Sequence, residues 1–288
     1  MRIAHLSDIH FTCWPKIHQL SFKRVLGTAN LILRRRKQDF PLNVQQRLVE
    51  HVLGLELDAV IITGDLTGQA LTHEFELALH TLRPLLDRFP SFIIPGNHDL
   101  YTLAAQRNRR MESFFGQWMA LDSPSLPVTR MDLGEVTLLG VNPCRPAILA
   151  SGKLPDDQLQ RLEQLLETPE LAERTVLLCI HYPIVDRHGD IYDSRAHGLL
   201  NAGPVVEMLR RVTQPPAAVL HGHVHHGYRL SLPGTQRDVQ VLNSGSSGYA
   251  YQPLRRRAAA MNVYTIGKQQ IENVERHVFD GTDFVTAT

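Results

Sequence analysis

An apolar run that stops abruptly and is followed by three polar residues constrains this chain more than any other feature. Phe92–Ile94 has the pattern of a buried strand, and a Pro-Gly pair ends it before Asn97, His98 and Asp99. In an open α/β sheet, ligands bind in the crevice beyond the carboxyl ends of the strands. We therefore expect a functional site here, although a simple turn that closes the strand is the alternative when this run is taken alone.

Four other apolar runs end in residues that can bind a metal ion. Those runs are Arg2–Ser7, Ala59–Thr63, Thr175–Ile180 and Ala217–Leu220, and they lead to Asp8 and His10, to Asp65, to His181, and to His223 and His225. Alternate residues of an extended segment share a face, so Asp8 and His10 are expected to point the same way. The repetition of this pattern favours one shared site over a set of unrelated turns.

The segments between these strands carry helical periodicity, with apolar residues at three- and four-residue spacing. We expect helices over Val44–Leu55, Leu71–Leu86, Leu103–Met119, Asp156–Leu166 and Pro204–Val212. Strands that alternate with helices are typical of an α/β protein, and strands and turns follow toward the C-terminus. The sequence shows no internal repeat and no low-complexity linker, which predicts a single domain over residues 1–288.

Together the strand ends supply seven oxygen and nitrogen ligands: Asp8, His10, Asp65, Asn97, His181, His223 and His225. A mixed set of carboxylate, imidazole and amide groups of this size is too large for one tetrahedral zinc ion and suits two ions of higher coordination number. Two such ions about 3.5–4 Å apart share a carboxylate and clamp the attacking and leaving oxygens of a phosphoryl group. The pattern therefore predicts hydrolysis of a phosphate ester.

Five motif blocks occur in a recognisable order over roughly residues 1–245. They are Asp8-Ile9-His10, Gly64-Asp65, Gly96-Asn97-His98-Asp99, His181 and Gly222-His223-Val224-His225. Their order resembles the D-x-H, G-D, G-N-H-D, H and G-H-x-H blocks of the calcineurin-like metallophosphoesterase superfamily. The resemblance implies an α/β fold, namely a four-layer αββα sandwich of two mixed sheets flanked by helices.

The resemblance also implies a ligand set for each metal ion. Asp8, His10 and His225 would hold the first ion, Asn97, His181 and His223 the second, and Asp65 would bridge them. We expect two divalent ions, manganese first, with iron, zinc, cobalt and nickel as the alternatives that such ligands accept.

Two further residues are candidate catalytic groups. Water activated by the metals would attack phosphorus in line, while His98 assists the leaving group and Asp99 orients His98 and raises its basicity. A metal-binding scaffold without activity is the hypothesis from another class, and the presence of both Asp65 and His98 argues against it.

A basic amphipathic insertion at about residues 11–41 bears on the substrate. Its apolar residues Phe22, Val25, Leu26, Ala29, Ile32 and Leu33 share one helical face, which Lys23, Arg24 and Arg34–Lys37 flank. Such a helix lies at an anionic membrane interface or contacts an acylated anionic substrate, and an ordinary helix that covers the sandwich is the alternative. With this insertion the sequence resembles UDP-2,3-diacylglucosamine pyrophosphohydrolases, which cleave a lipid-linked pyrophosphate; cyclic-nucleotide or generic small-molecule phosphodiesterases are the alternative.

Two polar loops, residues 188–201 and 244–251, are long enough to shape a pocket over the metals. In and beside them, Arg187, Arg195 and Tyr249 are candidate substrate contacts, and solvated loop residues are the alternative interpretation. Tyr182 follows His181 at a position where cyclic-nucleotide phosphodiesterases often have a second histidine, which is a small departure from that branch.

Composition and charge bear on which classes of protein and of partner remain. The 288 residues are 43% apolar, which allows a large core, and a formal net charge of +1 gives no reason to expect a nucleic-acid partner. The sequence has no apolar run of signal-peptide or transmembrane length, and its three cysteines show no paired spacing. We expect a cytoplasmic protein, with peripheral contact between residues 22–37 and the inner face of the membrane as a further hypothesis.

Overall fold

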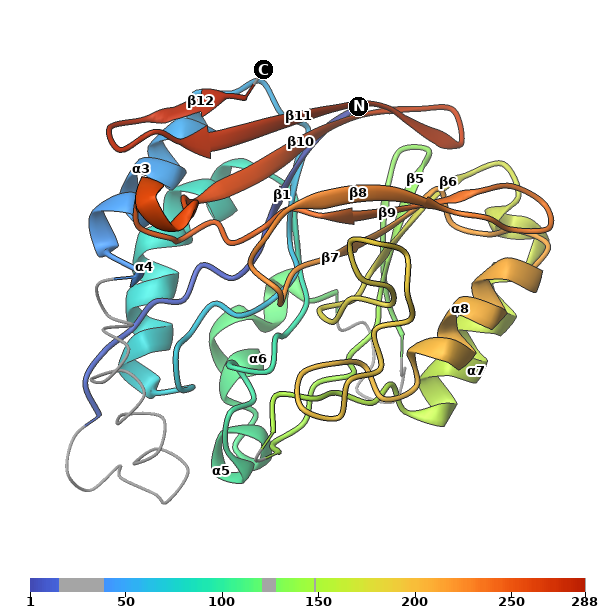
Figure 1. The fold of residues 1–288 in the computed structure, drawn as a ribbon, viewed down its shortest axis with the longest axis horizontal. Coiled ribbons are helices and arrows are strands. Elements are labelled where there is room, and N and C mark those ends of the chain that lie inside the picture. The colour runs from blue at the N-terminus through green and yellow to red at the C-terminus, as the bar shows by residue number, and fades with distance from the viewer. Residues whose placement is uncertain (16–38, 121–127, 148, 288) are drawn as a thin grey trace.

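The computed structural model describes residues 1–15, 39–120, 128–147 and 149–287. Within these ranges the chain forms two six-stranded sheets that pack face to face, with helices on the outer side of each sheet (Figure 1). The amphipathic helix predicted over residues 22–37 lies outside the described residues.

The first sheet has the strand order β12-β11-β10-β1-β2-β3. Its strands are β1 (Arg2–Leu6), β2 (Ala59–Ile62), β3 (Ser91–Ile93), β10 (Ala260–Gly267), β11 (Gln270–Phe279) and β12 (Phe284–Thr286). β1, β2 and β3 run parallel, so their carboxyl ends meet at one edge, whereas β10 runs antiparallel to β1. The predicted metal ligands of the first three motif blocks follow directly from that edge.

The second sheet has the strand order β4-β5-β6-β7-β9-β8. Its strands are β4 (Thr129–Leu133), β5 (Val136–Gly140), β6 (Thr175–Cys179), β7 (Ala218–His221), β8 (Tyr228–Leu232) and β9 (Val239–Asn243). β5, β6, β7 and β9 are parallel, and β4 and β8 are antiparallel edges, so this sheet is mixed like the first. His181 and the Gly-His-x-His block follow the carboxyl ends of β6 and β7.

The principal helices form the two outer layers. α3 (Leu42–Leu53), α4 (Thr72–Arg88) and α6 (Arg110–Phe115) pack on the first sheet, and α7 (Asp156–Leu166) and α8 (Ala202–Arg211) pack on the second (Figure 1). Shorter pieces occupy connections: α5 (Leu103–Arg107) and the 3-10 helices η2 (Gly116–Trp118), η3 (Pro169–Leu171) and η4 (Pro253–Arg255). This order of layers confirms the predicted αββα sandwich.

Alternation along the strands explains why each sheet has an apolar surface on both sides. In β2, Ala59 and Ile61 face the second sheet, whereas Val60 and Ile62 face the helices, and all four are buried. A strand buried on both faces is a continuous apolar run, and each such aliphatic side chain contributes about 1.5–3 kcal/mol on burial. Two helix–sheet cores and one sheet–sheet core therefore hold the strand ends in place.

One predicted helix is wrong. The segment expected to be a single helix over Leu103–Met119 is broken into α5, α6 and η2. The amide of Asn108 closes α5 on the carbonyl of Ala104, and Arg109 then adopts φ 46°, which an α-helix does not accommodate. None of the helices in the described part of the chain is both long enough and apolar enough to cross a bilayer.

Candidate metal centre

Five of the seven predicted ligands have left-handed backbone conformations. The φ angles are 51° at Asp8, 53° at His10, 56° at Asp65, 70° at His223 and 60° at His225. Non-glycine residues rarely adopt this region, which costs of order 1–3 kcal/mol each and concentrates at functional sites. The prediction that Asp8 and His10 converge holds, but alternation along a strand is not the reason: β1 ends at Leu6, and a tight loop aims the two side chains.

The surrounding backbone holds this conformation. The amides of Asp8 and His10 donate to the carbonyls of Gly64 and Asp65, both at 3.0 Å. The loops that carry the first and second motif blocks, called here the first and second motif loops, are therefore hydrogen-bonded to each other through their backbones. Gly64 has φ 97°, and a Cβ atom there would collide with the backbone of Gly96. The glycines are required because the second and third motif loops touch backbone to backbone.

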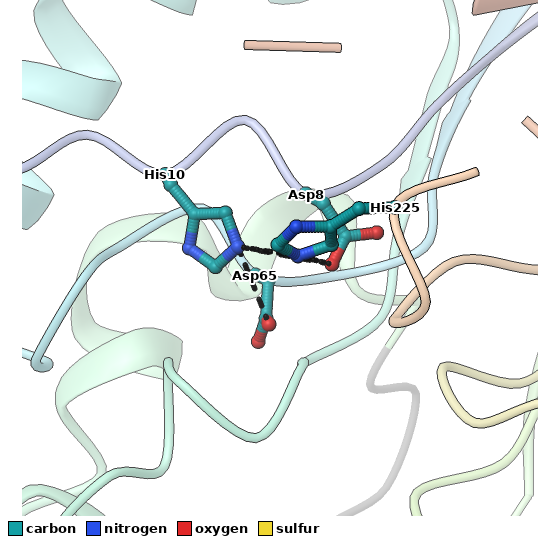
Figure 2. A group of neighbouring side chains, drawn as sticks. All are labelled: Asp8, His10, Asp65 and His225. Atoms are coloured by element: carbon teal, nitrogen blue, oxygen red, sulfur yellow. Dashed lines mark hydrogen bonds and ion pairs between the residues drawn. The ribbon is translucent and has the colours of Figure 1, made fainter. Parts of the chain in front are cut away.

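The first cluster consists of Asp8, His10, Asp65 and His225, whose ligand atoms all lie within 4.8 Å of one another. Figure 2 shows the rings of His10 and His225 turned toward each other beside the two carboxylates. The two Nε2 atoms are 3.1 Å apart, and the Oδ1 atom of Asp8 lies 3.2 Å from His225 Nε2. Four ligand atoms from three separate loops therefore converge on one point.

The hydrogen bonds around this cluster fit a bound cation. Nδ1 of His10 contacts the carbonyl of Thr67 at 3.2 Å and must donate to it, which leaves a lone pair on Nε2. Nδ1 of His225 is bound by the hydroxyl of Tyr249 at 3.0 Å. Oδ1 of Asp8 is buried and has no hydrogen-bond donor among the described residues. Converging lone pairs and an unsatisfied carboxylate oxygen are what a divalent cation would neutralise.

The second cluster consists of Asp65, His181 and His223, and Asn97 joins it. Nε2 of His181 lies 3.5 Å from Asp65 Oδ2 and 3.1 Å from Asn97 Oδ1, while its Nδ1 contacts the carbonyl of Thr63 at 2.7 Å. Nε2 of His223 donates to the carbonyl of His197 at 2.9 Å, so Nδ1 is the nitrogen that this residue offers to a metal.

Asp65 connects the clusters through one oxygen. Its Oδ2 atom lies 3.7 Å from His10 Nε2 and 3.5 Å from His181 Nε2, while its Oδ1 atom accepts the amide of His98 at 2.7 Å. The backbone bond fixes the carboxylate plane, and the other oxygen faces both groups of ligands. This is the arrangement expected for a carboxylate that bridges two ions.

Charge in the site favours cations. Burial opposes ionisation of Asp8 and Asp65, yet His225 and His181, respectively, hold the pKa of each carboxyl below its usual range. Burial also disfavours a charged His181, but Asp65 overcomes this and raises the pKa of His181 to about 9. Burial lowers the pKa of His10 and His223, which keeps them neutral. A metal ion and the proton of His181 therefore compete for the same negative charge.

His98 lies at the edge of the first cluster, with its ring 4.9 Å from the ring of His10 and 5.6 Å from the ring of Tyr101. Its Nδ1 atom contacts the carbonyl of Gly68 at 2.6 Å. The sequence-based expectation that Asp99 orients this imidazole is therefore wrong, because a backbone carbonyl occupies that position.

Asp99 instead joins the motif loops. Its buried carboxylate accepts the amides of Leu66, Thr67 and Gly96 at 2.9–3.2 Å. Burial and the charge of Asp65 raise the pKa of Asp99 to about 7 in spite of these bonds. The residue acts on the geometry of the site rather than on the leaving group.

The three residues predicted as substrate contacts differ in their burial and in what they contact. Tyr249 is largely buried and supports His225, as described above, and its ring also stacks on Phe40 at 4.8 Å. Arg187 and Arg195 are exposed, and Arg187 contacts His188. Sequence reasoning missed His197, whose carbonyl orients His223 and whose ring lies 4.1 Å from the ring of that residue.

Comparison with known proteins agrees with this geometry. Residues 1–227 match the family described as calcineurin-like phosphoesterase, and the chain belongs to that family. The family and the two clusters that share Asp65 make it a dinuclear metallophosphoesterase, as the motif blocks predicted.

Curated relatives are named as phosphodiesterases. A "Probable cyclic nucleotide phosphodiesterase" of Vesicomyosocius okutanii is 24% identical over 224 residues, which are 77% of this chain and 82% of the relative. A "Probable glycerophosphodiester phosphodiesterase" of Arcobacter nitrofigilis is 29% identical over 206 residues, 70% of this chain and 68% of the relative.

Solved structures share the fold. A purple acid phosphatase from yellow lupin seeds superposes with a TM-score of 0.60 at 10% identity over 99% of this chain and 52% of its own. A 5'-nucleotidase precursor of Thermus thermophilus gives 0.52 at 12% identity over 99% of this chain and 54% of its own. The chain spans about half the length of these two structures.

Proposed function

We propose that this protein hydrolyses small phosphodiesters, with a cyclic nucleotide or a glycerophosphodiester as the first substrates to test. The observation that carries the proposal is the shared oxygen of Asp65, which faces the ligands of both clusters. Asp8, His10 and His225 would hold one ion, and Asn97, His181 and His223 the other. The names of two curated relatives support a diester over a monoester.

The chemistry divides between the ions and the chain. When bound, two divalent ions supply activated water and neutralise charge on the phosphoryl group. His98 stands beside the first cluster, and its Nδ1 atom is bound to the Gly68 carbonyl, so a proton that it delivers to the leaving oxygen comes from Nε2. The carbonyl also stabilises the charged imidazole before the transfer.

The test is a panel of substrates with chelator-treated protein reloaded with manganese. The panel contains bis(p-nitrophenyl) phosphate, p-nitrophenyl phosphate, cyclic AMP, sn-glycero-3-phosphocholine and UDP-2,3-diacylglucosamine. Turnover of at least one small diester well above the monoester is the expected result. Preference for the monoester, or no turnover of any diester, overturns the proposal.

UDP-2,3-diacylglucosamine is in the panel because the sequence resemblance named it as a competing substrate. That resemblance depends on residues 22–37, which lie outside the described residues. Turnover of this lipid well above that of all the small diesters would show that the enzyme prefers to cleave a pyrophosphate bond. Flotation of the protein with anionic vesicles, compared with an Arg34, Arg35 and Arg36 to Glu variant, tests the associated membrane contact.

We propose manganese as the resident metal, because mixed carboxylate, amide and imidazole ligands accept it readily. Protein freed of metal is titrated in turn with manganese, iron, zinc, cobalt and nickel, and diesterase activity is measured at each addition. Higher activity with any other ion than with manganese contradicts this assignment but leaves the reaction class intact.

A further inference from the structure

The loop between β6 and α8 is a folded unit beside the second cluster. Asp186 Oδ1 accepts the amides of His188 and Asp190 at 2.7 and 3.1 Å, and this turn closes the tip of the loop. The amide of Leu199 donates to the carbonyl of Tyr192 at 2.9 Å, which closes its base. Residues 192–198 are therefore held in one arrangement.

Gly198 fixes the approach of this loop to the site. A Cβ atom on Gly198 would collide with the amide of Ser194 and lie 2.6 Å from the carbonyl of Tyr192, so only glycine fits the turn. The preceding residue, His197, is thereby placed with its carbonyl on the Nε2 atom of His223 and its ring 4.1 Å from the His223 ring.

The side chain of His197 is only partly engaged by the fold. The residue is exposed, and its Nδ1 atom lies 3.3 Å from the Tyr192 hydroxyl. No hydrogen bond to its Nε2 atom is found among the residues that the structure describes. An imidazole that packs on a predicted metal ligand and leaves polar atoms toward solvent is placed to touch a substrate.

Two imidazoles thus stand beside the two clusters. His98 lies next to His10 of the first cluster, and His197 lies next to His223 of the second. A phosphodiester carries two alcohol substituents, one that leaves and one that stays on phosphorus. If His98 serves the first, His197, beside the other cluster, is the candidate to contact the second.

We propose that His197, assisted by the Tyr192 hydroxyl, determines specificity by hydrogen-bonding a hydroxylated alcohol substituent that stays on phosphorus. The inference rests on the proposed phosphodiesterase function and deepens it. A neutral imidazole and a phenol donate and accept hydrogen bonds without adding charge, which suits the hydroxyl groups of a sugar or of glycerol. A monoester has no such substituent.

The experiment uses two diesters with the same leaving group. Thymidine 5'-(p-nitrophenyl) phosphate keeps a hydroxylated sugar on phosphorus, whereas methyl p-nitrophenyl phosphate keeps only a methyl group. The variants are His197→Ala, His197→Gln and Tyr192→Phe in the full chain. The matched control is His188→Ala, an exposed histidine of the same loop. The carbonyl of residue 197 stays in place in both of its variants.

For His197→Ala we expect KM for the thymidine ester to rise about fivefold to tenfold, the worth of one to two neutral hydrogen bonds, with kcat little changed. KM for the methyl ester should stay within about twofold of wild type. His197→Gln should restore part of the loss, Tyr192→Phe should show a smaller effect of the same kind, and His188→Ala should match wild type. Metal content, measured by mass spectrometry, should be the same in all five proteins.

Equal losses on both esters, or loss of metal in His197→Ala, would show that the ring only supports His223 and would overturn the inference. An unchanged KM for the thymidine ester would overturn it as well. In each of these cases wild type still hydrolyses diesters, so the proposed function stands. If wild type hydrolyses neither ester, both the proposed phosphodiesterase function and this inference are wrong.

Discussion

The imidazoles of His10 and His225 face each other with their Nε2 atoms 3.1 Å apart. His10 donates its other nitrogen to a backbone carbonyl, so this short contact brings a lone pair against the neighbouring ring beside an unsatisfied oxygen of Asp8. A cation bound among these atoms would take up both nitrogen lone pairs and satisfy the Asp8 oxygen. We therefore expect metal binding to stabilise the fold.

Metal removal should lower thermal stability. Binding of an ion at about a thousand times its Kd contributes about 4 kcal/mol, which corresponds to roughly 8 °C in a chain of this size. The measurement is Tm by differential scanning fluorimetry before and after chelation, and then after manganese is added back. Chelation should lower the Tm of a His10→Ala variant by less than it lowers the Tm of wild type. Identical melting curves of wild type with and without chelator would contradict the expected stabilisation by metal.

Replacement of Asp65 should affect both ions, whereas replacement of His10 should affect one. We expect Asp65→Asn to bind neither ion tightly and His10→Ala to retain about one ion per chain, because Asp65 is the residue that both clusters share in the described part of the chain. Diesterase kcat should fall by about a thousandfold or more in Asp65→Asn. Metal stoichiometry by mass spectrometry is the direct measurement, and loss of just one ion from Asp65→Asn would argue against a bridge.

Tyr249→Phe should weaken the first metal position without unfolding the chain. The change removes the hydroxyl on Nδ1 of His225, and groups that orient a ligand are worth about 10–100-fold in metal affinity. Tyr251→Phe, an exposed tyrosine two residues away, is the matched control. Metal affinity is measured by competition with a fluorescent chelator, and equal affinities in the two variants would remove Tyr249 from the site.

Asp99→Asn should destabilise the fold rather than abolish acid catalysis. An amide side chain cannot accept all three backbone amides that the carboxylate accepts, and a buried amide left without an acceptor costs about 1–3 kcal/mol. Chemical denaturation should show this loss, while the pH dependence of kcat keeps its shape in metal-loaded protein. A pH profile that loses its acidic or basic limb would restore the role that sequence alone assigned to Asp99.

A histidine pair far from the metals should make stability depend on pH. Nε2 of His51 lies 3.0 Å from Nδ1 of His277, and burial lowers the pKa of both, with mutual repulsion adding to the shift of His51. Asp283 acts against the shift of His51 and Glu275 against that of His277, whereas Arg2 adds to the latter. The pair is therefore harder to protonate in the folded chain than in the unfolded one.

The direction of this pH dependence follows from the linkage between protonation and folding. Below the ordinary histidine pKa of about 6.5 the unfolded chain binds more protons than the folded one, so the free energy of unfolding falls as pH falls, by less than about 1.4 kcal/mol per pH unit for one proton. His51→Gln should lose less Tm between pH 7.5 and 5.5 than wild type. His80→Gln, an exposed histidine on α4, is the control, and parallel Tm curves for all three proteins would refute the prediction.

The fold and the positions of the metal ligands could be predicted because both depend on the kind of side chain at each position, which the sequence shows directly. Buried strands such as β2 are apolar runs, and Asp65 follows that strand directly. The groups that orient the ligands could not be predicted, because the carbonyls of Thr63 and Thr67 have no sequence signature. The break at Arg109 was missed for a similar reason, since helical periodicity continues across it.

The contact between Gly64 and Gly96 has a consequence for redesign. The loops that carry Gly64-Asp65 and Gly96-Asn97-His98-Asp99 meet backbone to backbone at the two glycines, and the carboxylates of Asp65 and Asp99 add hydrogen bonds to backbone amides across this contact. Exchange of a ligand other than Asp65, such as His10, for a harder or softer donor would change which ion is preferred and leave this loop contact as it is. Metal preference can therefore be changed in this scaffold without a change at the loop contact that positions Asp65.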